Sequence, residues 1–231
     1  MLDDVSRKSS KRLRSRHIGE SRNIADLAVV LVIVVADVRG YIPFSSTPFL
    51  FAVGWISLRL RKIGWREVGF AWPRDSRVIG LAVLVGVGYQ FISLYAVEPV
   101  LARLTGARPD ASLFASLGGN LVMLGFTLAI IWTLAAFGEE MVFRGYLLDR
   151  LARLGGRSRV AWAAAAVATS VAFGAGHAYQ GVSGVIDNTL TGLVLAGLYV
   201  AAGRSLVAPI VAHGTYDTTA AILMFFRKYP T

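Results

Sequence analysis

The chain has 231 residues, of which 55% are hydrophobic and 16% are charged, and its formal net charge is +10. A soluble domain is typically about 45–50% apolar and about 25% charged, so this chain has more apolar surface than a water-soluble fold of its size can bury. The composition excludes a disordered or collagen-like chain. Because the sequence contains no cysteine, it also excludes a disulfide framework, a cysteine nucleophile and a thiolate metal site.

Several long windows of the chain contain no Asp, Glu, Lys or Arg. They cover residues 40–58, 78–97, 111–138, 160–176, 188–203 and 205–216. About 20 apolar residues cross the hydrocarbon core of a bilayer, and several windows reach that length, some only if an acidic residue such as Asp187 is tolerated inside. Together with the apolar stretch 24–37, they predict an all-α fold, a polytopic transmembrane bundle of about seven or eight helices.

The basic residues indicate how the bundle lies in the membrane. Seven Lys and Arg residues precede residue 23, and further clusters occur at 59–77 and 144–159. Since cytoplasmic loops carry the excess of Lys and Arg, the N-terminus, the 59–77 loop and the turn at 150–159 are expected to be cytoplasmic. The early spans are then expected at 24–38, 43–60, 78–98 and 113–138. The positive charge therefore indicates a lipid bilayer as partner and no nucleic acid; the tail is either solvated or in contact with anionic headgroups.

A single membrane domain is expected. Its segments are a basic cytoplasmic tail (1–23), a transmembrane helical domain (24–226) and a short C-terminal tail (227–231). The long charged N-terminal region has no A-x-A-like site after its apolar stretch, so a retained anchor is expected rather than a signal peptide. Twenty Arg against four Lys, together with short loops, favour a multi-pass protein of a prokaryotic inner membrane.

Three polar clusters lie inside or beside the apolar windows, where ionisable groups are costly and tend to face the protein interior. They are Glu139 and Glu140 with Arg144, Phe173 with His177, and His213 with Asp217. Residues four apart share a helix face, so Glu140 is predicted to pair with Arg144. Glu139 points about 100° away and stays available for chemistry.

The two histidines belong to clusters with the same spacing of four residues. The Phe173 ring can pack on the His177 imidazole, and His213 precedes Asp217 by one turn. Two membrane histidines with two glutamates form a set that can activate water, directly or as metal ligands. Each cluster alone also fits a structural role, as an ion pair at the membrane border or as a histidine hydrogen-bonded between helices.

Chain geometry allows these clusters to meet. The segment 154–158 is predicted to be a turn between antiparallel helices, with Glu139 about 24 Å before it and His177 about 32 Å after it. His213 lies about 15 Å beyond a turn at 203–204, so a helix break at Gly174 and Gly176, or at Pro209, is expected. An unbroken helix over 113–153 would be about 60 Å long, so it is expected to bend, for example at Gly138, or to protrude.

In their order on successive spans, the motifs Glu-Glu-x-x-x-Arg, Phe-x-x-x-His and His-x-x-x-Asp resemble the CPBP family of intramembrane proteases, also called Abi. That family includes the type II CAAX prenyl endopeptidases and bacteriocin-processing and bacteriocin-immunity proteins. The resemblance covers roughly 113–226 and extends over the run 139–147. It implies an intramembrane endopeptidase that cleaves membrane-associated peptides or proteins.

The resemblance also implies a role for each motif residue. The water would be activated by Glu139 with His177, the tetrahedral oxyanion would be stabilised by His213 with Asp217, and the motif helix would be held by Glu140 with Arg144. The prenyl endopeptidases have Asn where this chain has Asp217, and an ionised Asp cannot donate a hydrogen bond to an oxyanion. Asp217 would then orient His213, be protonated, or mark a bacterial branch of the family.

Two alternatives stay open. Glutamate and histidine can activate water without a cofactor, but Glu139, His177 and His213 could also hold a catalytic zinc. Metal-independent chemistry is favoured, since the Phe–His and His–Asp spacings need no metal and no His-Glu-x-x-His motif is present. The alternative function is a non-enzymatic immunity or protein-interaction factor of the same family; a small ion-coupled transporter is disfavoured because no inverted repeat is evident.

Overall fold

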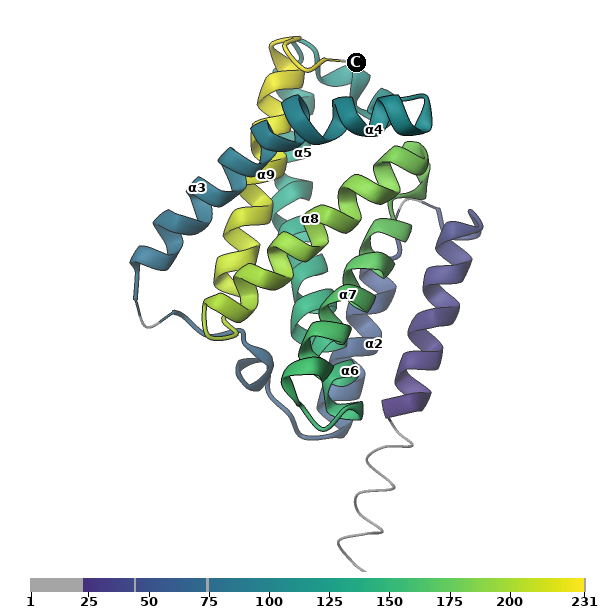
Figure 1. The fold of residues 1–231 in the computed structure, drawn as a ribbon, viewed down its shortest axis with the longest axis vertical. Helices are drawn as coiled ribbons and strands as arrows, with labels where there is room; N and C mark the ends of the chain where they lie inside the picture. Colours follow the sequence, from purple (N-terminus) through teal and green to yellow (C-terminus); the bar gives the residue numbers. More distant parts are fainter. Residues whose placement is uncertain (1–22, 44, 74, 231) are drawn as a thin grey trace, which may run out of the picture.

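The computed structural model describes residues 23–43, 45–73 and 75–230. Within these ranges the chain is helical and contains no strand, which confirms the predicted all-α class (Figure 1). Nearly all of the predicted basic tail, 1–23, lies outside the described residues, as does the last residue of the predicted C-terminal tail.

The first part of the described chain is a helical hairpin followed by one long helix. The hairpin consists of a helix over residues 23–38 and α2 (Thr47–Leu60). After the short 3₁₀ turn η1 (Trp65–Val68), a continuous helix comprises α3 (Arg77–Ile92), the π-helical η2 (Ser93–Val97) and α4 (Glu98–Thr105). Gly106 ends this helix in the left-handed conformation, with φ of 89°.

The next helix, over residues 121–154, is the central helix of the bundle. It follows the 3₁₀ turn η3 (Ser112–Leu117), and the Asn120 side chain caps it by accepting a hydrogen bond from the Met123 N–H at 3.1 Å. Its consecutive parts are α5 (Leu121–Ile130), η4 (Ile131–Glu139), η5 (Met141–Leu147) and α6 (Leu148–Leu154). Both η4 and η5 are wound as π-helix, a form that is frequent at functional sites.

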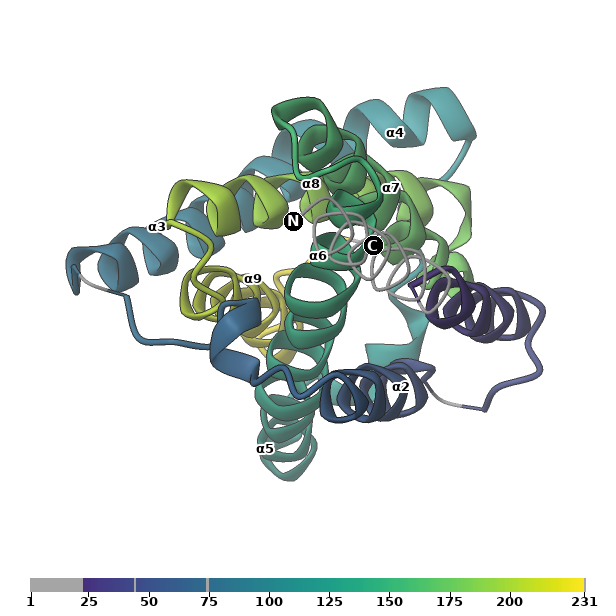
Figure 2. The same ribbon diagram turned by 90° about the horizontal axis from the view of Figure 1, so that it is seen from below.

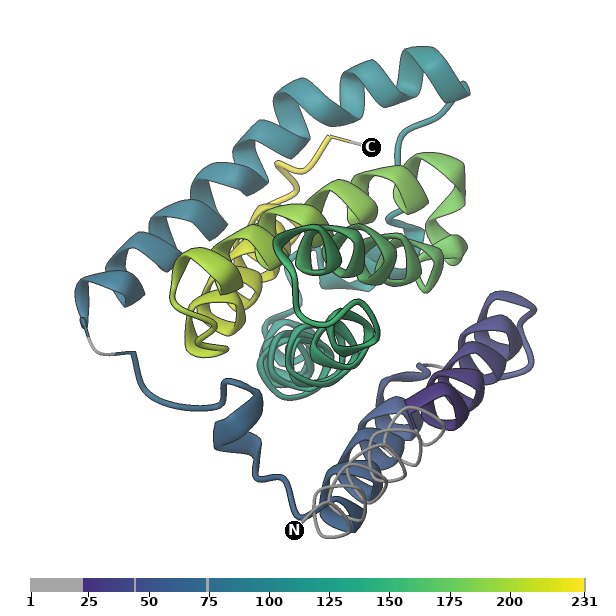
Figure 3. The ribbon, with the colours of Figure 1, turned by 60° about the horizontal axis from the view of Figure 1, so that its bottom comes forward.

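The remaining helices complete the bundle. They are α7 (Arg159–Ala175), the 3₁₀ turn η6 (Ala178–Gln180), α8 (Gly181–Ala201) and α9 (Val207–Phe225). Figure 3, which looks nearly along the central helix, shows the 23–60 hairpin on one side of it and α3, α8 and α9 on the other. Buried apolar side chains tie these groups together, and one core cluster joins Leu50 and Leu58 of α2 to Tyr146 and Phe173.

The helices have the character that a bilayer requires. By length and composition, three helices of the described chain can cross a membrane, namely Arg77–Thr105, Leu121–Leu154 and Ala178–Ala201. Shorter apolar helices cover Thr47–Leu60 and Arg159–Ala175. Large apolar side chains such as Leu84, Val122 and Phe126 are exposed on the outside, as lipid-facing residues are. The chain is thus a helical membrane bundle, and the count of seven or eight spans stays a prediction.

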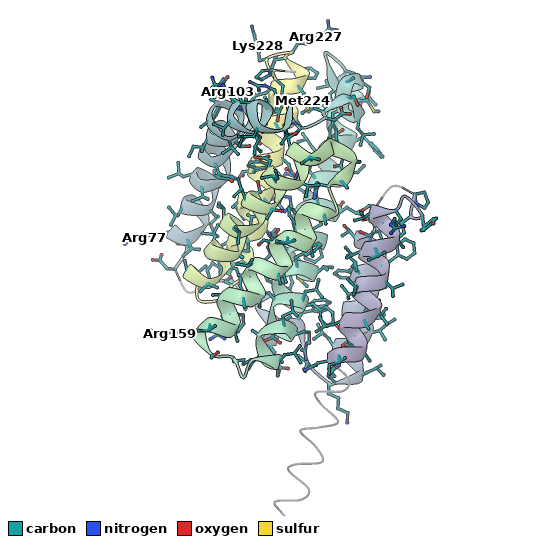
Figure 4. All side chains as sticks on the ribbon, turned by 45° about the vertical axis from the view of Figure 1, so that its right-hand side comes forward. Arg77, Arg103, Arg159, Met224, Arg227 and Lys228 are labelled. Carbon is teal, nitrogen blue, oxygen red and sulfur yellow. The ribbon has the colours of Figure 1, made fainter. Side chains whose placement is uncertain are left out.

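The connections between helices gather at two ends of the bundle. Those after α2, α6 and α8 lie at one end, and those after α4 and α7 lie toward the other (Figures 1 and 2). The predicted basic clusters after α2 and α6 therefore share one end. Figure 4 shows Arg159 at that end and Arg103, Arg227 and Lys228 at the opposite one. That the α2 and α6 end faces the cytoplasm remains a prediction from the basic clusters.

Two expectations about helix boundaries need correction. The predicted span 113–138 begins only at Leu121, because η3 and the Gly118-Gly119 pair, with φ of 75° at Gly119, interrupt the helix before it. The helix does not end at Gly138 either. It continues to Leu154, and the expected irregularity takes the form of π-helical winding on both sides of Glu140.

The helix break expected between His177 and His213 is found at the first of the two expected places. α7 ends at Ala175 with Gly176 as its cap, whereas α9 passes through Pro209 without interruption. Gly174 allows this tight connection, because a Cβ there would lie 2.1 Å from Thr189 Oγ1 of α8. His177 is therefore in the connection between α7 and α8 rather than inside a span.

Candidate active site

The Glu140–Arg144 pair is the most enclosed part of the candidate site. Arg144 Nη1 donates to Glu140 Oε1 at 2.6 Å, and the two side chains are 1% and 0% exposed. Arg144 Nη2 donates to the Gly192 carbonyl of α8 at 3.0 Å, and the guanidinium carbon lies 4.7 Å from the centre of the Phe173 ring. Arg144 thus links the central helix to α7 and α8 at once.

Glu140 has a second partner that helical spacing does not predict. His213 Nδ1 of α9 lies 2.9 Å from the same Oε1, and His213 Nε2 lies 3.3 Å from Asp217 Oδ2. His213 is therefore held between two carboxylates and is nearly fully buried. A neutral imidazole has only one N–H, so hydrogen bonds at both nitrogens require either the imidazolium form, which donates twice, or a protonated carboxylate that donates to the second nitrogen.

Glu139, the neighbouring carboxylate, has a different environment. Its Oε1 accepts a hydrogen bond from Thr47 Oγ1 at the start of α2, at 3.3 Å, and its buried Oε2 has no hydrogen-bond partner among the described residues. The charges of His177, His213 and Asp217 all act on it. Among the described residues, the hydrogen-bond partner of Glu139 is thus on α2, whereas Glu140 is bound by Arg144 on the same helix.

His177 is oriented by the end of the helix that precedes it. Its Nδ1 lies 2.9 Å from the Phe173 carbonyl oxygen, which can only accept, so Nδ1 carries a proton, and in the neutral ring Nε2 then has a free lone pair. The Phe173 ring packs against the His177 ring with centres 4.8 Å apart, and against His213 at 5.8 Å. Phe173, itself buried, is thus the common wall of both histidines and of the Arg144 guanidinium.

The structure brings all seven motif residues into one neighbourhood between the central helix, α7 and α9. They are Glu139, Glu140, Arg144, Phe173, His177, His213 and Asp217. The motif spacings do not include Thr47 or the Gly192 carbonyl. Thr47 lies in a charge-free window next to Ser45 and Ser46, and a hydroxyl group before an apolar helix is too common to indicate a site.

The histidines and carboxylates of the candidate site could in principle bind a metal ion. Among residues 23–230, apart from 44 and 74, no three His, Asp or Glu side chains are arranged so that they could hold a metal ion. His213 already faces a carboxylate with each ring nitrogen, so it would have to give up one of these contacts to bind zinc. The described residues as placed do not fit a three-ligand zinc site.

A second polar cluster lies apart from these residues, between the α3–α4 helix and α8 and α9. Buried Asp187 accepts a hydrogen bond from Ser93 Oγ at 2.7 Å, and buried Glu98 accepts one from the Tyr229 hydroxyl at 2.8 Å. Arg108 also lies 3.3 Å from Glu98. These partners explain how a span accommodates Asp187, since buried polar groups need hydrogen bonds.

The fold and the site together define a helical membrane protein with a buried glutamate–histidine centre. Residues 121–219 match the family model described as type II CAAX prenyl endopeptidase, Rce1-like. The match covers less than half of the chain but contains every motif residue. It confirms the resemblance of this part of the chain to the CAAX protease family of membrane proteases. Comparisons with curated proteins and with solved structures give no significant match.

Proposed function

We propose that the protein is an intramembrane endopeptidase that cleaves membrane-associated peptides or proteins by attack of a water activated by Glu139 and His177. The observation that carries the proposal is the contrast between the two adjacent glutamates. The buried Oε2 of each glutamate has no hydrogen-bond partner among the described residues, but Oε1 of Glu140 is bound by Arg144 and His213, whereas Oε1 of Glu139 accepts only a long hydrogen bond from Thr47. A carboxylate in such a place can accept a proton, and a scaffold has no need of it.

The proposed reaction assigns each proton. Glu139 Oε2 takes a proton from the water while His177 Nε2 accepts a hydrogen bond from it, and the water oxygen forms a bond to the scissile carbonyl carbon. The C–N bond of the tetrahedral intermediate then breaks, and the proton on Glu139 passes to the leaving amine. The products are a new carboxylate and a free amino terminus.

His213 is the group proposed to stabilise the oxyanion. Its two carboxylate neighbours, Glu140 and Asp217, favour the imidazolium, and its Nε2–H would be shared between Asp217, which is at the long distance of 3.3 Å, and the developing negative charge of the substrate. Asp217 is half-buried and lies on the Nε2 side, which supports an orienting role for this residue. Such a role is compatible with the Asn of the prenyl endopeptidases, because an orienting acceptor can be either residue type.

The proposed chemistry is independent of metal. Elemental analysis of the purified protein, with cleavage measured before and after chelation, tests this directly. Sub-stoichiometric zinc and unchanged cleavage after chelation are expected. Stoichiometric zinc whose removal abolishes cleavage would contradict the proposal.

Two assays test the function itself. The first measures hydrolysis of an internally quenched, farnesylated peptide with a CAAX-type end by the full chain in detergent. The second compares the peptides released from membranes of strains that express the wild type or Glu139→Gln. Glu139→Gln and His177→Ala are expected to lose cleavage at normal expression, whereas Gly88→Ala, which has open space around the added Cβ, serves as control. If both site variants keep the cellular phenotype, the non-enzymatic immunity or interaction function is favoured.

A further inference from the structure

The start of α2 contacts the proposed base from outside the family-matched segment. Thr47 is buried as the first residue of α2, and its hydroxyl donates to Glu139 Oε1 at 3.3 Å. This length is at the long end for a hydrogen bond, as contacts of catalytic groups often are without substrate. The other oxygen of the same carboxylate, Oε2, has no partner among the described residues. The two oxygens of Glu139 are therefore not equivalent.

The hydroxyl of Thr47 is itself oriented by its neighbour. Ser45 Oγ donates to Thr47 Oγ1 at 3.1 Å and accepts from the Thr47 N–H at 3.2 Å. Because Thr47 Oγ1 accepts from Ser45, its own hydrogen is free to be donated onward to Glu139. A chain of two hydrogen bonds thus leads from the Ser45 hydroxyl through the Thr47 hydroxyl to the Glu139 carboxylate.

The surroundings of Thr47 and Glu139 allow the two side chains to lie close together. A Cβ at Gly138, the residue before Glu139, would lie 3.0 Å from Thr47 Cγ2, so a side chain there would push Thr47 away. On the other side, Ser46 Oγ donates to Asp37 Oδ2 at 2.5 Å and ties the start of α2 to the end of the 23–38 helix. Thr47 is therefore held in place from both sides.

We infer that Thr47 is a positioning residue for Glu139. Its hydroxyl anchors Oε1, stabilises the ionised carboxylate and leaves Oε2 as the oxygen that takes the proton from water. This inference rests on the proposed role of Glu139 as base. It assigns to the N-terminal hairpin, which lies outside residues 121–219, a direct part in setting the basicity of the centre.

The test separates the hydroxyl of Thr47 from its methyl group. Thr47→Val keeps the shape and the methyl contact with Gly138 but removes the donor, whereas Thr47→Ser keeps the donor and removes the methyl. Thr133→Val is the matched control, since within the described part of the chain the Thr133 hydroxyl bonds only to the Ala129 carbonyl of its own helix. All variants are made in the full chain and purified in detergent, and their melting temperatures are compared.

The first measurement needs no substrate. An infrared pH titration follows the protonated-carboxyl band that is present in the wild type and absent from Glu139→Gln. In Thr47→Val the midpoint is expected to rise by about one pH unit, because losing a hydrogen bond to the charged form favours protonation. Thr47→Ser and Thr133→Val are expected to titrate like the wild type.

The second measurement is kcat for the quenched farnesylated peptide. Thr47→Val is expected to lower kcat about tenfold with little change in KM, and to move the acidic limb of the pH–rate profile upward. An unshifted titration in Thr47→Val, or an equal shift in Thr47→Ser, overturns the inference, since the effect would then be absent or due to packing. Should Thr47→Val fail to fold, Ser45→Ala, which removes the donor to Thr47, must shift the same midpoint, and no shift again overturns it.

The outcomes distinguish this inference from the function on which it rests. If Glu139→Gln still cleaves the peptide, the proposed function fails, and the infrared titration alone decides whether Thr47 acts on Glu139. If Glu139→Gln is inactive and Thr47→Val behaves like the wild type in both measurements, the proposed function stands and only the positioning role fails.

Discussion

Glu140→Gln removes a charge from the most enclosed point of the site. Glu140 has no exposed surface, and its Oε1 is the acceptor for both Arg144 at 2.6 Å and His213 at 2.9 Å. Gln keeps the shape of the side chain and one acceptor oxygen. It leaves the Arg144 guanidinium, which is 1% exposed, without a counter-ion.

The magnitude follows from the cost of an unpaired buried charge. Breaking a buried ion pair by removing one partner costs about 3–5 kcal/mol, and the remaining acceptor oxygen of Gln places this variant near the lower value. For a chain of this size, about 1 kcal/mol corresponds to roughly 2–4 °C in melting temperature. Glu140→Gln is therefore expected to melt about 6–12 °C below the wild type, with reduced but measurable cleavage because His213 also loses a partner.

Glu139→Gln is the matched comparison, since it makes the same chemical change one residue earlier. Among the described residues Glu139 forms no ion pair with an arginine, so the melting temperature of Glu139→Gln is expected to stay near that of the wild type, while its cleavage rate falls by about 10²–10⁴-fold. Thermal unfolding in detergent and peptide hydrolysis of both variants give the two quantities. An inactive but stable Glu140→Gln together with an active Glu139→Gln would exchange the two roles and refute the argument.

Three further predictions concern other contacts. Arg144→Lys is expected to melt well below the wild type, because a single ammonium cannot bind both Glu140 and the Gly192 carbonyl as the forked guanidinium does. A variant that is as stable as the wild type but inactive would mean that Arg144 acts in the chemistry instead. Asp217→Asn is expected to retain most of the hydrolysis rate and Asp217→Leu to lose it, since only the former can still accept from His213 Nε2; equal loss in both would show that the charge of Asp217 is essential. Gly86→Ala is expected to reduce expression and thermal stability, because its Cβ would lie 2.1 Å from Thr215 Oγ1 and 2.2 Å from the Ala212 carbonyl of α9. Gly88→Ala in the same helix has open space around the added Cβ and should be neutral. Equal stability of the two variants would contradict the close crossing of α3 and α9.

Much of the candidate site follows from local rules. The pairs Glu140–Arg144, Phe173–His177 and His213–Asp217 are each four residues apart, and helix geometry places such residues side by side whatever surrounds them. The membrane class is equally direct, because a chain with 55% hydrophobic residues in long charge-free windows can satisfy its backbone in a bilayer only as helices or a closed barrel. These features depend on composition and spacing, which are properties of the sequence by itself.

The contacts between helices are of another kind. Three contacts depend on which helix faces meet and at what depth. His213 and Arg144 bind the same oxygen of Glu140, Phe173 packs against both histidines, and Thr47 contacts Glu139. Even the start of the central helix at Leu121 and the π-helical turns around Glu140 are not marked by any spacing of residues. Helix crossing angles and registers are set jointly by the side chains of all packed helices, so only the tertiary structure decides them. For the same reason, the hydroxyl group that contacts Glu139 comes from a hairpin that carries none of the motifs.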